Sequence, residues 1–207
     1  MPKNVFIILM LNLSLFNVLI AQDRANMILT VAPKSELTII GKTNVNTFTC
    51  RYTEVMSDTL NIEVIRNKGD YMIDNAEMTF HVSAFDCGNA MMNEDFKDLL
   101  NADEFPVIRV NFKSLYMTPG QSKEIMGSII AQFELAGTEG ASPINILKKP
   151  EKSQTNDYFG FTNLDITNFG LEPPTKMMGM IKVKKDIKVE FDLNVIVLQP
   201  LQALSAK

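Results

Sequence analysis

The sequence predicts a mainly β protein, a closed antiparallel β-barrel of about eight strands with one helix after the fourth strand. Short runs of alternating apolar and polar residues recur along the chain, and turn-type residues separate them. Only one segment of the mature chain carries apolar residues at helical spacing, and strands do not alternate with helices. An open sheet of this size would leave a face and two edges exposed, whereas closure into a barrel removes the edges.

The first 21 residues are expected to be a secretory signal peptide. Lys3 precedes an almost unbroken apolar run at residues 5–20, and Ala21 places a small residue just before Gln22. An uncleaved membrane anchor is the competing interpretation, but the run is slightly short for a span and contains polar residues. We therefore expect cleavage between Ala21 and Gln22, and a periplasmic or secreted mature chain without a transmembrane span.

The mature chain is expected to consist of a lead at residues 22–34, a barrel domain at 35–199 and a C-terminal tail at 200–207. The four strands expected before the helix are residues 35–41, 45–52, 60–66 and 76–84. Turn-type residues at 42–44 and 67–70 separate two pairs of these strands. The fourth strand alternates most cleanly, and its apolar face consists of Ala76, Met78, Phe80, Val82 and Ala84. One buried face per strand is typical of antiparallel sheet.

One convincing helix follows the fourth strand. Asn89 or Asn93 can cap its first turn, because an Asn side chain accepts a hydrogen bond from a free backbone N–H. The apolar face of the helix consists of Met92, Phe96, Leu99 and Leu100. Pro106 then restarts an extended chain.

Further strands are expected to the end of the barrel domain, at residues 106–112, 127–135, 143–147, 158–166 and 188–198. Residues 137–140 contain two glycines and are typical of a turn or bulge, and residues 148–156 form a charged loop. The last strand is the longest, with an apolar face made of Val189, Phe191, Leu193, Val195 and Val197.

Cys50 and Cys87 are the only cysteines, and export to an oxidising compartment would allow them to form a disulfide. Closing this loop would stabilise the fold by roughly 3–4 kcal/mol through the entropy of the unfolded chain. Two buried free thiols are the alternative. Redox catalysis is not expected, because the chain has no Cys-x-x-Cys motif.

Charge and motifs argue against an enzyme, a metal site, a cofactor and a nucleic-acid partner. The net charge is −4 and the basic residues are dispersed, whereas nucleic-acid binding needs a concentrated basic surface. His81 is the single histidine, and its place on the polar face of a strand predicts a surface or rim position. Phosphate-binding glycine loops, nucleophile motifs and metal-ligand spacings are not found.

The inward faces of the strands would line an apolar interior. The chain has 13 Phe and 13 Met, and large flexible side chains suit a capacious or irregular interior. A cavity of this kind would suit an acyl or isoprenoid chain, while a filled core is equally consistent with the periodicity. The candidate lipid-contacting residues are Ile62, Val64, Met78, Phe80, Val82, Phe96, Ile108, Val110, Phe112, Ile129, Phe133, Phe191 and Leu193.

Several motifs, taken in their order and spacing, resemble the YceI-like family of exported lipid-binding proteins. The motifs are FDC at 85–87, MNEDF at 92–96, EFPVI at 104–108, FELAGT at 133–138, LDITNFGL at 164–171 and the closing strand at 188–197. The resemblance covers nearly all of the mature sequence. It implies a lipocalin-like barrel with a helix by its mouth and a hydrophobic tunnel for a polyisoprenoid or similar amphiphile, a periplasmic location and, in some relatives, a homodimer.

The chain departs from the family pattern at two places that bear on the head group of a ligand. These are the segment TNVNTFTC at residues 43–50, and Ile166 and Thr167, where many members carry Arg. The expected function is a periplasmic or secreted binding protein that sequesters or carries an isoprenoid-type or fatty amphiphilic lipid. The alternative is a non-enzymatic structural or stress interaction protein with a packed barrel core and no lipid.

Overall fold

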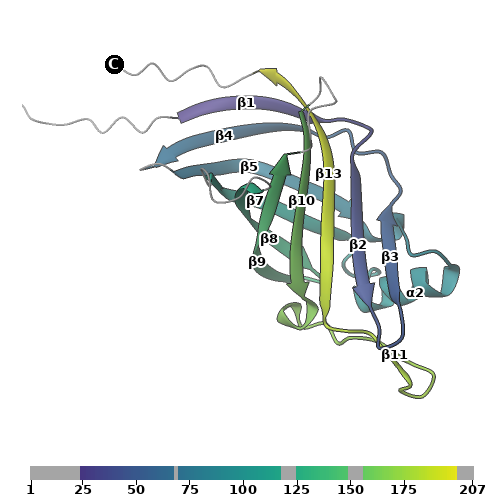
Figure 1. The fold of residues 1–207 in the computed structure, drawn as a ribbon. Helices are drawn as coiled ribbons and strands as arrows, with labels where there is room; N and C mark the ends of the chain where they lie inside the picture. Colours follow the sequence, from purple (N-terminus) through teal and green to yellow (C-terminus); the bar gives the residue numbers. More distant parts are fainter. Residues whose placement is uncertain (1–23, 68–69, 118–124, 149–155, 200–207) are drawn as a thin grey trace, which may run out of the picture.

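Antiparallel strands form most of the computed structural model, which describes residues 24–67, 70–117, 125–148 and 156–199 (Figure 1). The elements in chain order are β1 (Arg24–Val31), β2 (Glu36–Lys42), β3 (Thr47–Tyr52), β4 (Thr59–Asn67), β5 (Asp70–His81), η1 (Val82–Ala84), β6 (Phe85–Asp86), α2 (Ala90–Leu99), β7 (Val107–Met117), β8 (Ile125–Leu135), β9 (Thr138–Lys148), β10 (Asn156–Asp165), η2 (Ile166–Phe169), β11 (Thr175–Lys176), β12 (Ile181–Lys182) and β13 (Asp186–Gln199). The elements η1 and η2 are short 3-10 helices.

Eight strands close into a ring in the order β1, β4, β5, β7, β8, β9, β10 and β13, because β13 pairs again with β1. Strands β2, β3 and β6 extend the same sheet from the side of β13. The strand pairs of the ring are antiparallel. The predicted mainly β fold, an antiparallel barrel of about eight strands with a helix, is therefore confirmed.

Strand β13 connects the two parts of the sheet. One edge pairs with β10 along residues 186–195. The other edge is shared, because β2 pairs with residues 188–192 and β1 pairs with residues 195–199. Figure 1 shows β1 and β2 leaving β13 in different directions. Strands β1 and β4 therefore complete the closed ring, whereas β2, β3 and β6 form an extension of the sheet on the same edge of β13.

Ser35 forms hydrogen bonds with the backbone of β13 at the junction between β1 and β2. Its hydroxyl oxygen Oγ donates to the Asn194 carbonyl oxygen at 3.3 Å and accepts from the Asn194 N–H at 3.0 Å. The Ala32 N–H donates to the same carbonyl oxygen at 2.8 Å. Ser35 is buried, so these bonds satisfy a polar group inside the wall where the regular ladder is interrupted.

Helix α2 begins where the sequence predicts it. The Asn89 side chain caps the helix by accepting a hydrogen bond from the Met92 N–H at 3.0 Å. The other candidate, Asn93, instead accepts from the Cys87 N–H at 2.6 Å and so fixes the chain that leads into the helix. The predicted apolar face packs against the main core with Met92, Phe96, Leu99 and Leu100.

The disulfide between Cys50 and Cys87 joins β3 to the start of α2. Both cysteines are almost fully buried, at 1% and 5% exposure. The free-thiol alternative is therefore wrong for this structure. Because β3 also pairs with β6, the disulfide reinforces a contact that the sheet already makes.

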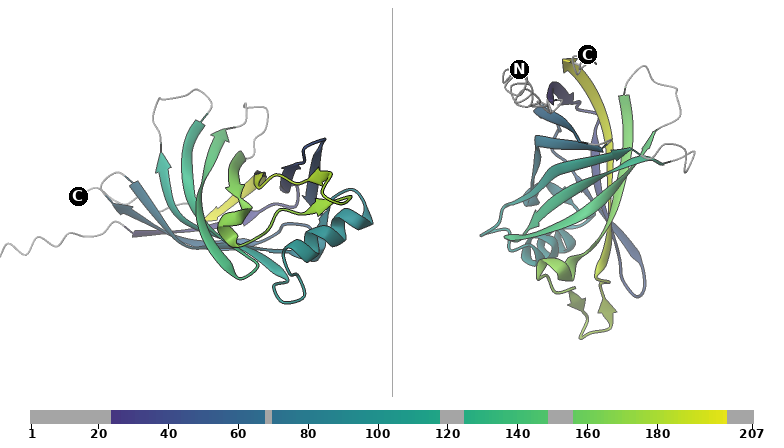
Figure 2. Two further views of the ribbon diagram at one scale, coloured as in Figure 1. Left: turned by 90° about the horizontal axis from the view of Figure 1, so that it is seen from below. Right: turned by 90° about the vertical axis from the view of Figure 1, so that its left-hand side faces the viewer.

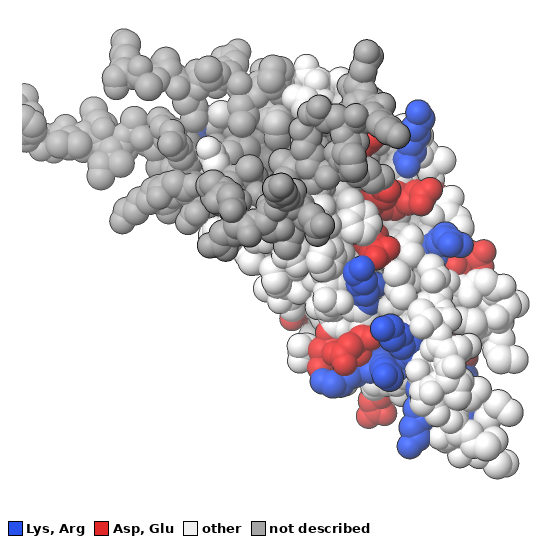
Figure 3. All heavy atoms as spheres, viewed as in Figure 1, with Lys and Arg blue, Asp and Glu red and all other residues white. Residues whose placement is uncertain are grey.

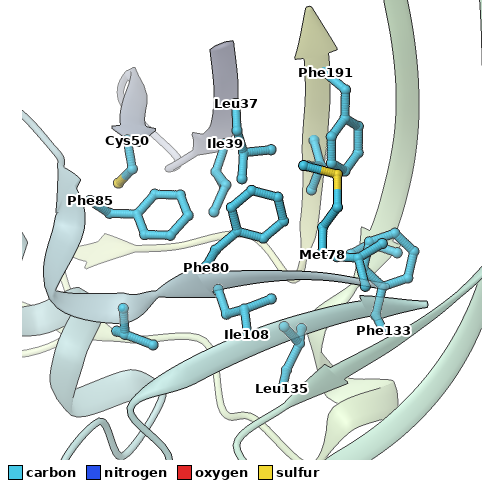
Figure 4. Packing of buried hydrophobic residues seen from close by; sticks show 14 of the residues in the cluster. Leu37, Ile39, Cys50, Met78, Phe80, Phe85, Ile108, Phe133, Leu135 and Phe191 are labelled. Carbon is cyan, nitrogen blue, oxygen red and sulfur yellow. The ribbon is translucent and has the colours of Figure 1, made fainter. Parts of the chain in front are cut away.

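The interior contains a main apolar cluster beside α2 and a smaller apolar cluster on β4 and β5. Figure 4 shows side chains from β2, β5, β7, β8 and β13 converging on the main cluster. The smaller cluster is built on Ile62, Val64 and Ala76. In β5 the predicted alternation is confirmed, since Met78 and Phe80 are buried while Thr79 is exposed.

Several elements differ from the sequence prediction, among them β9, which starts at Thr138 where a turn or bulge at 137–140 and a strand at 143–147 are predicted. β1 occupies most of the segment expected as a lead, and β5 starts at Asp70 and gives way to η1 before Ala84. β7 continues to Met117, and the small β11–β12 hairpin was not predicted. The pairing of β5 with β7 shifts between Met72 and Ala76, and such bulges interrupt the alternation on which strand prediction depends.

The turn between β8 and β9 requires its glycine. Ala136 has φ 46° and Gly137 has φ 74°, and two central residues with positive φ are typical of a two-residue hairpin turn. A Cβ at Gly137 would lie 2.6 Å from Cε1 of Phe105. Both the backbone conformation and the space therefore favour glycine here.

Several predictions fall outside the described residues. These are the signal peptide with its cleavage between Ala21 and Gln22, the tail at 200–207, and parts of the turn at 67–70 and of the charged loop at 148–156. None of the helices in the part of the chain that the structure describes has the length and apolar content needed to span a membrane.

Removing the disulfide by the double substitution Cys50→Ala/Cys87→Ala should lower the free energy of unfolding by about 4 kcal/mol. The bridge restricts a loop with a sequence separation of 37 residues in the unfolded chain. Equilibrium unfolding in urea measures the change. A reductant should destabilise the wild type similarly and leave the double variant unaffected. Equal stability of the oxidised and reduced wild type would contradict this account.

Candidate functional site: an apolar cavity at the helix end

An apolar cavity of about 80 Å³ lies inside the barrel next to α2. Phe80 from β5, Phe133 from β8 and Phe191 from β13 contribute aromatic rings to its wall. Figure 4 shows Leu37 and Ile39 from β2 facing Phe80 across this interior. All of the lining side chains are aliphatic, aromatic or the disulfide sulfur of Cys50, so the cavity offers only apolar contact.

Helix α2 and the segment between β10 and β13 cover this end of the barrel (Figure 2). Phe96 and Leu99 reach the cavity from the helix, and Ile166 reaches it from η2. None of the residues of α2 itself is fully buried, although Leu100 just after it is 4% exposed. The side chains of α2, which covers this end of the barrel, are therefore less completely buried than those of the surrounding strands.

Six of the thirteen predicted lipid-contacting residues line this cavity. They are Phe80, Phe96, Ile108, Val110, Phe133 and Phe191. Met78 and Val82 are buried in the same core without lining the cavity. Phe112 and Leu193 are partly buried against that core, Ile62 and Val64 belong to the smaller cluster, and Ile129 is half-buried in β8. Contact of any of these residues with a lipid stays a prediction.

Fourteen lining residues are absent from the set predicted from the sequence: Leu37, Ile39, Phe48, Cys50, Phe85, Leu99, Leu100, Leu135, Leu164, Ile166, Leu171, Val183, Ile187 and Val189. Some lie on predicted apolar faces, so period-two alternation could have found Leu37, Ile39 and Val189. Ile166, Leu171 and Val183 lie in η2 or in irregular chain, where no periodicity marks an inward direction.

Polar groups inside the barrel are few and already satisfied. Among the described residues, the only buried polar ones are Ser35 and Thr162. The Thr162 hydroxyl lies 2.9 Å from the Ser142 hydroxyl. No described buried side-chain nitrogen or oxygen lacks a hydrogen-bond partner, and the described residues contain no cluster of His, Cys, Asp and Glu that could hold a metal ion. The cavity therefore provides binding surface rather than reactive groups.

The Tyr52 hydroxyl forms a hydrogen-bonded group with the exposed residues Glu54 and His81, while the Tyr52 ring packs against the main core. The Tyr52 hydroxyl donates to Glu54 Oε2 at 2.7 Å, and His81 Nδ1 lies 3.0 Å from the same oxygen. Burial and the Glu54 hydrogen bond raise the pKa of Tyr52 to about 12. Hydrogen bonds from His81 and Tyr52 lower the pKa of the Glu54 carboxyl. His81 is exposed, so its predicted surface or rim position is confirmed.

Asp165 holds the start of η2, which carries cavity-lining Ile166. Its carboxylate bonds to Lys185 Nζ at 2.5 Å and accepts from the Thr167 N–H at 3.0 Å. The Lys185 hydrogen bond, followed by the Thr167 hydroxyl, lowers the pKa of Asp165 to about 2. The same contact raises the pKa of Lys185. This ion pair therefore links the cover of the cavity to the start of β13.

Charges of both signs are interspersed over the face shown in Figure 3. Ion pairs such as Arg109 with Glu134, at 2.8 Å, neutralise part of the charge of the described chain. This face therefore presents no concentrated basic surface of the kind that nucleic-acid binding requires.

Substituting Asp165→Asn should lower the melting temperature at neutral pH and weaken its dependence on acid pH. The folded-state pKa of about 2 lies below the ordinary value of 3.8, so the wild-type carboxylate stabilises the fold fully above about pH 4. This stabilisation is lost as the pH falls from 4 towards 2. Thermal unfolding at several pH values measures it. Asp103→Asn, which removes the same charge from an exposed turn, is the control and should keep the wild-type profile.

Comparison with known proteins identifies the fold and its relatives. A family model described as the YceI-like domain matches residues 34–195. The structure of Burkholderia cenocepacia BcnA aligns with 79% of this chain and 96% of its own, at 16% identity and a TM-score of 0.55. A polyisoprenoid binding domain from Saccharophagus degradans, implicated in plant cell wall breakdown, aligns with 85% of this chain and 99% of its own, at 14% identity and a TM-score of 0.50. No curated protein sequence matches the chain.

Proposed function

Since this chain belongs to the YceI-like family, we propose that it is an exported binding protein that holds one long-chain amphiphile, of the isoprenoid or fatty type, inside its barrel. The observation that carries the proposal is the cavity beneath α2, whose lining is entirely apolar. The Saccharophagus degradans domain of similar fold is described as polyisoprenoid binding, which supports this class of ligand.

Apolar burial supplies the binding free energy in this proposal. Each methylene that leaves water contributes about 0.8 kcal/mol, so ten of them contribute about 8 kcal/mol before the cost of ordering the chain. A polar head group would have to stay near the cover, because both buried polar residues of the described interior already have partners. The ligand would be bound passively and released unchanged, and we propose no enzymatic activity and no resident cofactor or metal.

The cavity must enlarge to admit a long chain. An engineered apolar cavity that binds benzene has a volume of about 150 Å³, well above the 80 Å³ found here. Helix α2 is the element best placed to move, because Met92, Phe96 and Leu99 are only partly buried. Outward displacement of these three side chains would join their volume to the cavity.

Export to the periplasm or the cell exterior forms part of the proposal. The buried disulfide supports an oxidising compartment, and the apolar run at residues 5–20 has the layout of a secretory leader. Homodimerisation, implied by the family resemblance, stays a prediction that sedimentation velocity can measure.

The small cavity favours a second candidate function, a non-enzymatic structural or stress interaction protein with a packed core. Phe80, Phe133 and Met78 are each 2% exposed or less, as expected for a filled interior. Organic extraction of protein purified from its own host, followed by mass spectrometry, distinguishes the two candidates. A stoichiometric long-chain lipid supports the carrier, and its reproducible absence supports the packed barrel.

Two matched substitutions test where a lipid would lie. Val189 and Val64 are both inward-facing strand residues, at 6% and 9% exposure, but only Val189 lines the cavity. Val189→Phe should lower the amount of co-purified lipid about tenfold or more, because the ring fills the cavity, whereas Val64→Phe should leave it near the wild-type level. Val64→Phe should cost ~1–3 kcal/mol of stability through overpacking, and Val189→Phe should cost no more, because the cavity accommodates part of the ring.

Quantitative mass spectrometry measures the lipid, and urea unfolding checks that both variants fold. Equal loss of lipid in the two variants would mean that the ligand extends into the smaller cluster. Equal retention would contradict the assignment of the cavity as the binding site.

A further inference from the structure

Four exposed apolar side chains gather at the end of the barrel that contains the cavity. Met177, Met178 and Met180 lie around the turn between β11 and β12, and Val45 lies in the turn between β2 and β3. Their exposed fractions are 62%, 106%, 64% and 67% respectively. We call these four residues the methionine tip. Figure 2 shows the β11–β12 hairpin projecting beyond the rest of the barrel. Grouped large apolar residues at such exposure mark a surface that meets an apolar partner.

Hydrogen bonds hold the two turns together as one projection. The Asn44 side chain donates from Nδ2 to the Met180 carbonyl oxygen at 2.9 Å. Its Oδ1 accepts from the Lys182 N–H at 2.9 Å, and the Asn44 N–H donates to the Lys182 carbonyl oxygen at 3.1 Å. The methionine tip is therefore supported by a paired framework rather than by a single free loop.

The backbone of the tip does not favour methionine. Met177 and Met178 have φ values of 52° and 55°, and Gly179 follows with φ 89°. Asn and Gly adopt this left-handed conformation most readily, whereas an unbranched apolar side chain gains nothing there. Folding alone therefore gives no reason for two methionines at these positions.

Lysines lie at the base of the tip, although the whole chain is acidic. Residues 175–188 contain five Lys and one Asp, within a chain of net charge −4. Lys176 and Lys185 are engaged with Asp95 and Asp165. Lys42, Lys182 and Lys184 form no ion pair within the part of the chain that the structure describes, and the Lys184 N–H donates to the Lys42 carbonyl oxygen at 2.8 Å. In Figure 3 the projecting end is white, with blue atoms beside it.

We propose that the methionine tip inserts into the head-group region of a bilayer that contains anionic phospholipids. The flexible apolar side chains of Met177 and Met178 would enter the boundary between head groups and acyl chains. The lysines at the base would lie at the level of the phosphates, where an anionic surface attracts them. The acidic remainder of the molecule would be repelled, so the protein would touch the membrane by this end alone.

Docking by the tip would also fix which end of the barrel faces the membrane, because the tip and the cavity share one segment of the chain. The hairpin emerges from the segment between Leu171 and Val183, and both of these residues line the cavity. A docked molecule would therefore hold the covered end of its barrel against the bilayer. This consequence rests on the proposed carrier function, whereas membrane docking itself does not.

Flotation with phospholipid vesicles tests the proposal. The protein is expressed for export, and N-terminal sequencing first verifies that the apolar run at residues 5–20 has been removed. The wild type should bind phosphatidylcholine vesicles that contain phosphatidylglycerol, bind pure phosphatidylcholine vesicles weakly, and lose affinity as salt rises. No binding to the anionic vesicles would overturn the proposal.

Variants locate the contact. Met177→Asn/Met178→Asn should lower the partition coefficient at least about tenfold without loss of thermal stability, since Asn accepts the left-handed conformation. Lys182→Gln/Lys184→Gln should lower it by about 25-fold at low salt. Val55→Asn removes an equally exposed apolar residue, at 68%, from outside the tip and should change binding less than about twofold. Wild-type affinity in both double variants would overturn the proposal.

Two further readouts distinguish membrane docking from self-association and from lipid carriage. If the methionine variant changes the sedimentation coefficient while vesicle binding stays unaltered, the tip is an interface between two copies of the chain and the proposal is wrong. Lipid extraction from the same samples separates docking from the carrier function. Vesicle binding without extracted lipid supports docking and contradicts the carrier, and extracted lipid without vesicle binding does the reverse.

Discussion

The divided edge of β13 is the constraint on which the rest of the structure depends. One edge of a strand can pair with two other strands only if each of them pairs with a different stretch of it. On β13, β2 pairs before residue 194 and β1 pairs after it. This division closes the ring through β1 and β4 and also directs β2, β3 and β6 towards the helix. Ser35 makes it possible, because its hydroxyl satisfies the Asn194 backbone where the ladder changes partner.

The position of the cavity follows from this arrangement. The β2–β3–β6 extension places Phe85 and the disulfide beside the start of α2, so the barrel is covered at one end. Phe85 lies 5.1 Å from the Phe96 ring and 5.2 Å from the Tyr52 ring, between centroids. The aromatic side chains thus form a continuous contact from the wall to the helix, and the space that they leave unfilled is the cavity.

Period-two alternation explains what the sequence could predict. It predicts the inward direction of Phe80, Ile108 and Phe191 correctly, because the strand pairing is regular around each of these residues. It placed Phe112 less well, since the pairing of β7 with β8 shifts between Phe112 and Ser114. Such a bulge depends on the partner strand and leaves no mark in the local sequence.

Period-two alternation also fails to predict which residues of irregular chain point inward, for a different reason. Ile166 and Leu171 point inward because η2 and the following turn are held by the ion pair of Asp165 with Lys185, a contact between distant parts of the sequence. Periodicity does not predict β1, because its first residues, Arg24 to Asn26, are mainly polar and follow directly on the expected leader. Periodicity predicts the barrel and its helix, and the motif resemblance agrees with both, but neither indicates the volume left inside.

That volume decides what kind of ligand the barrel could select. Opening the cover returns three partly buried side chains to water, and each costs at most about 1.5–3 kcal/mol. A short ligand of two or three carbons recovers too little to offset this cost, at about 0.8 kcal/mol per methylene. The three side chains together cost at most about 9 kcal/mol, and a chain of about twelve or more carbons recovers more than that. If the proposed carrier function holds, a nearly filled barrel under a shallowly packed helix would select ligands by chain length, without any polar contact to the ligand.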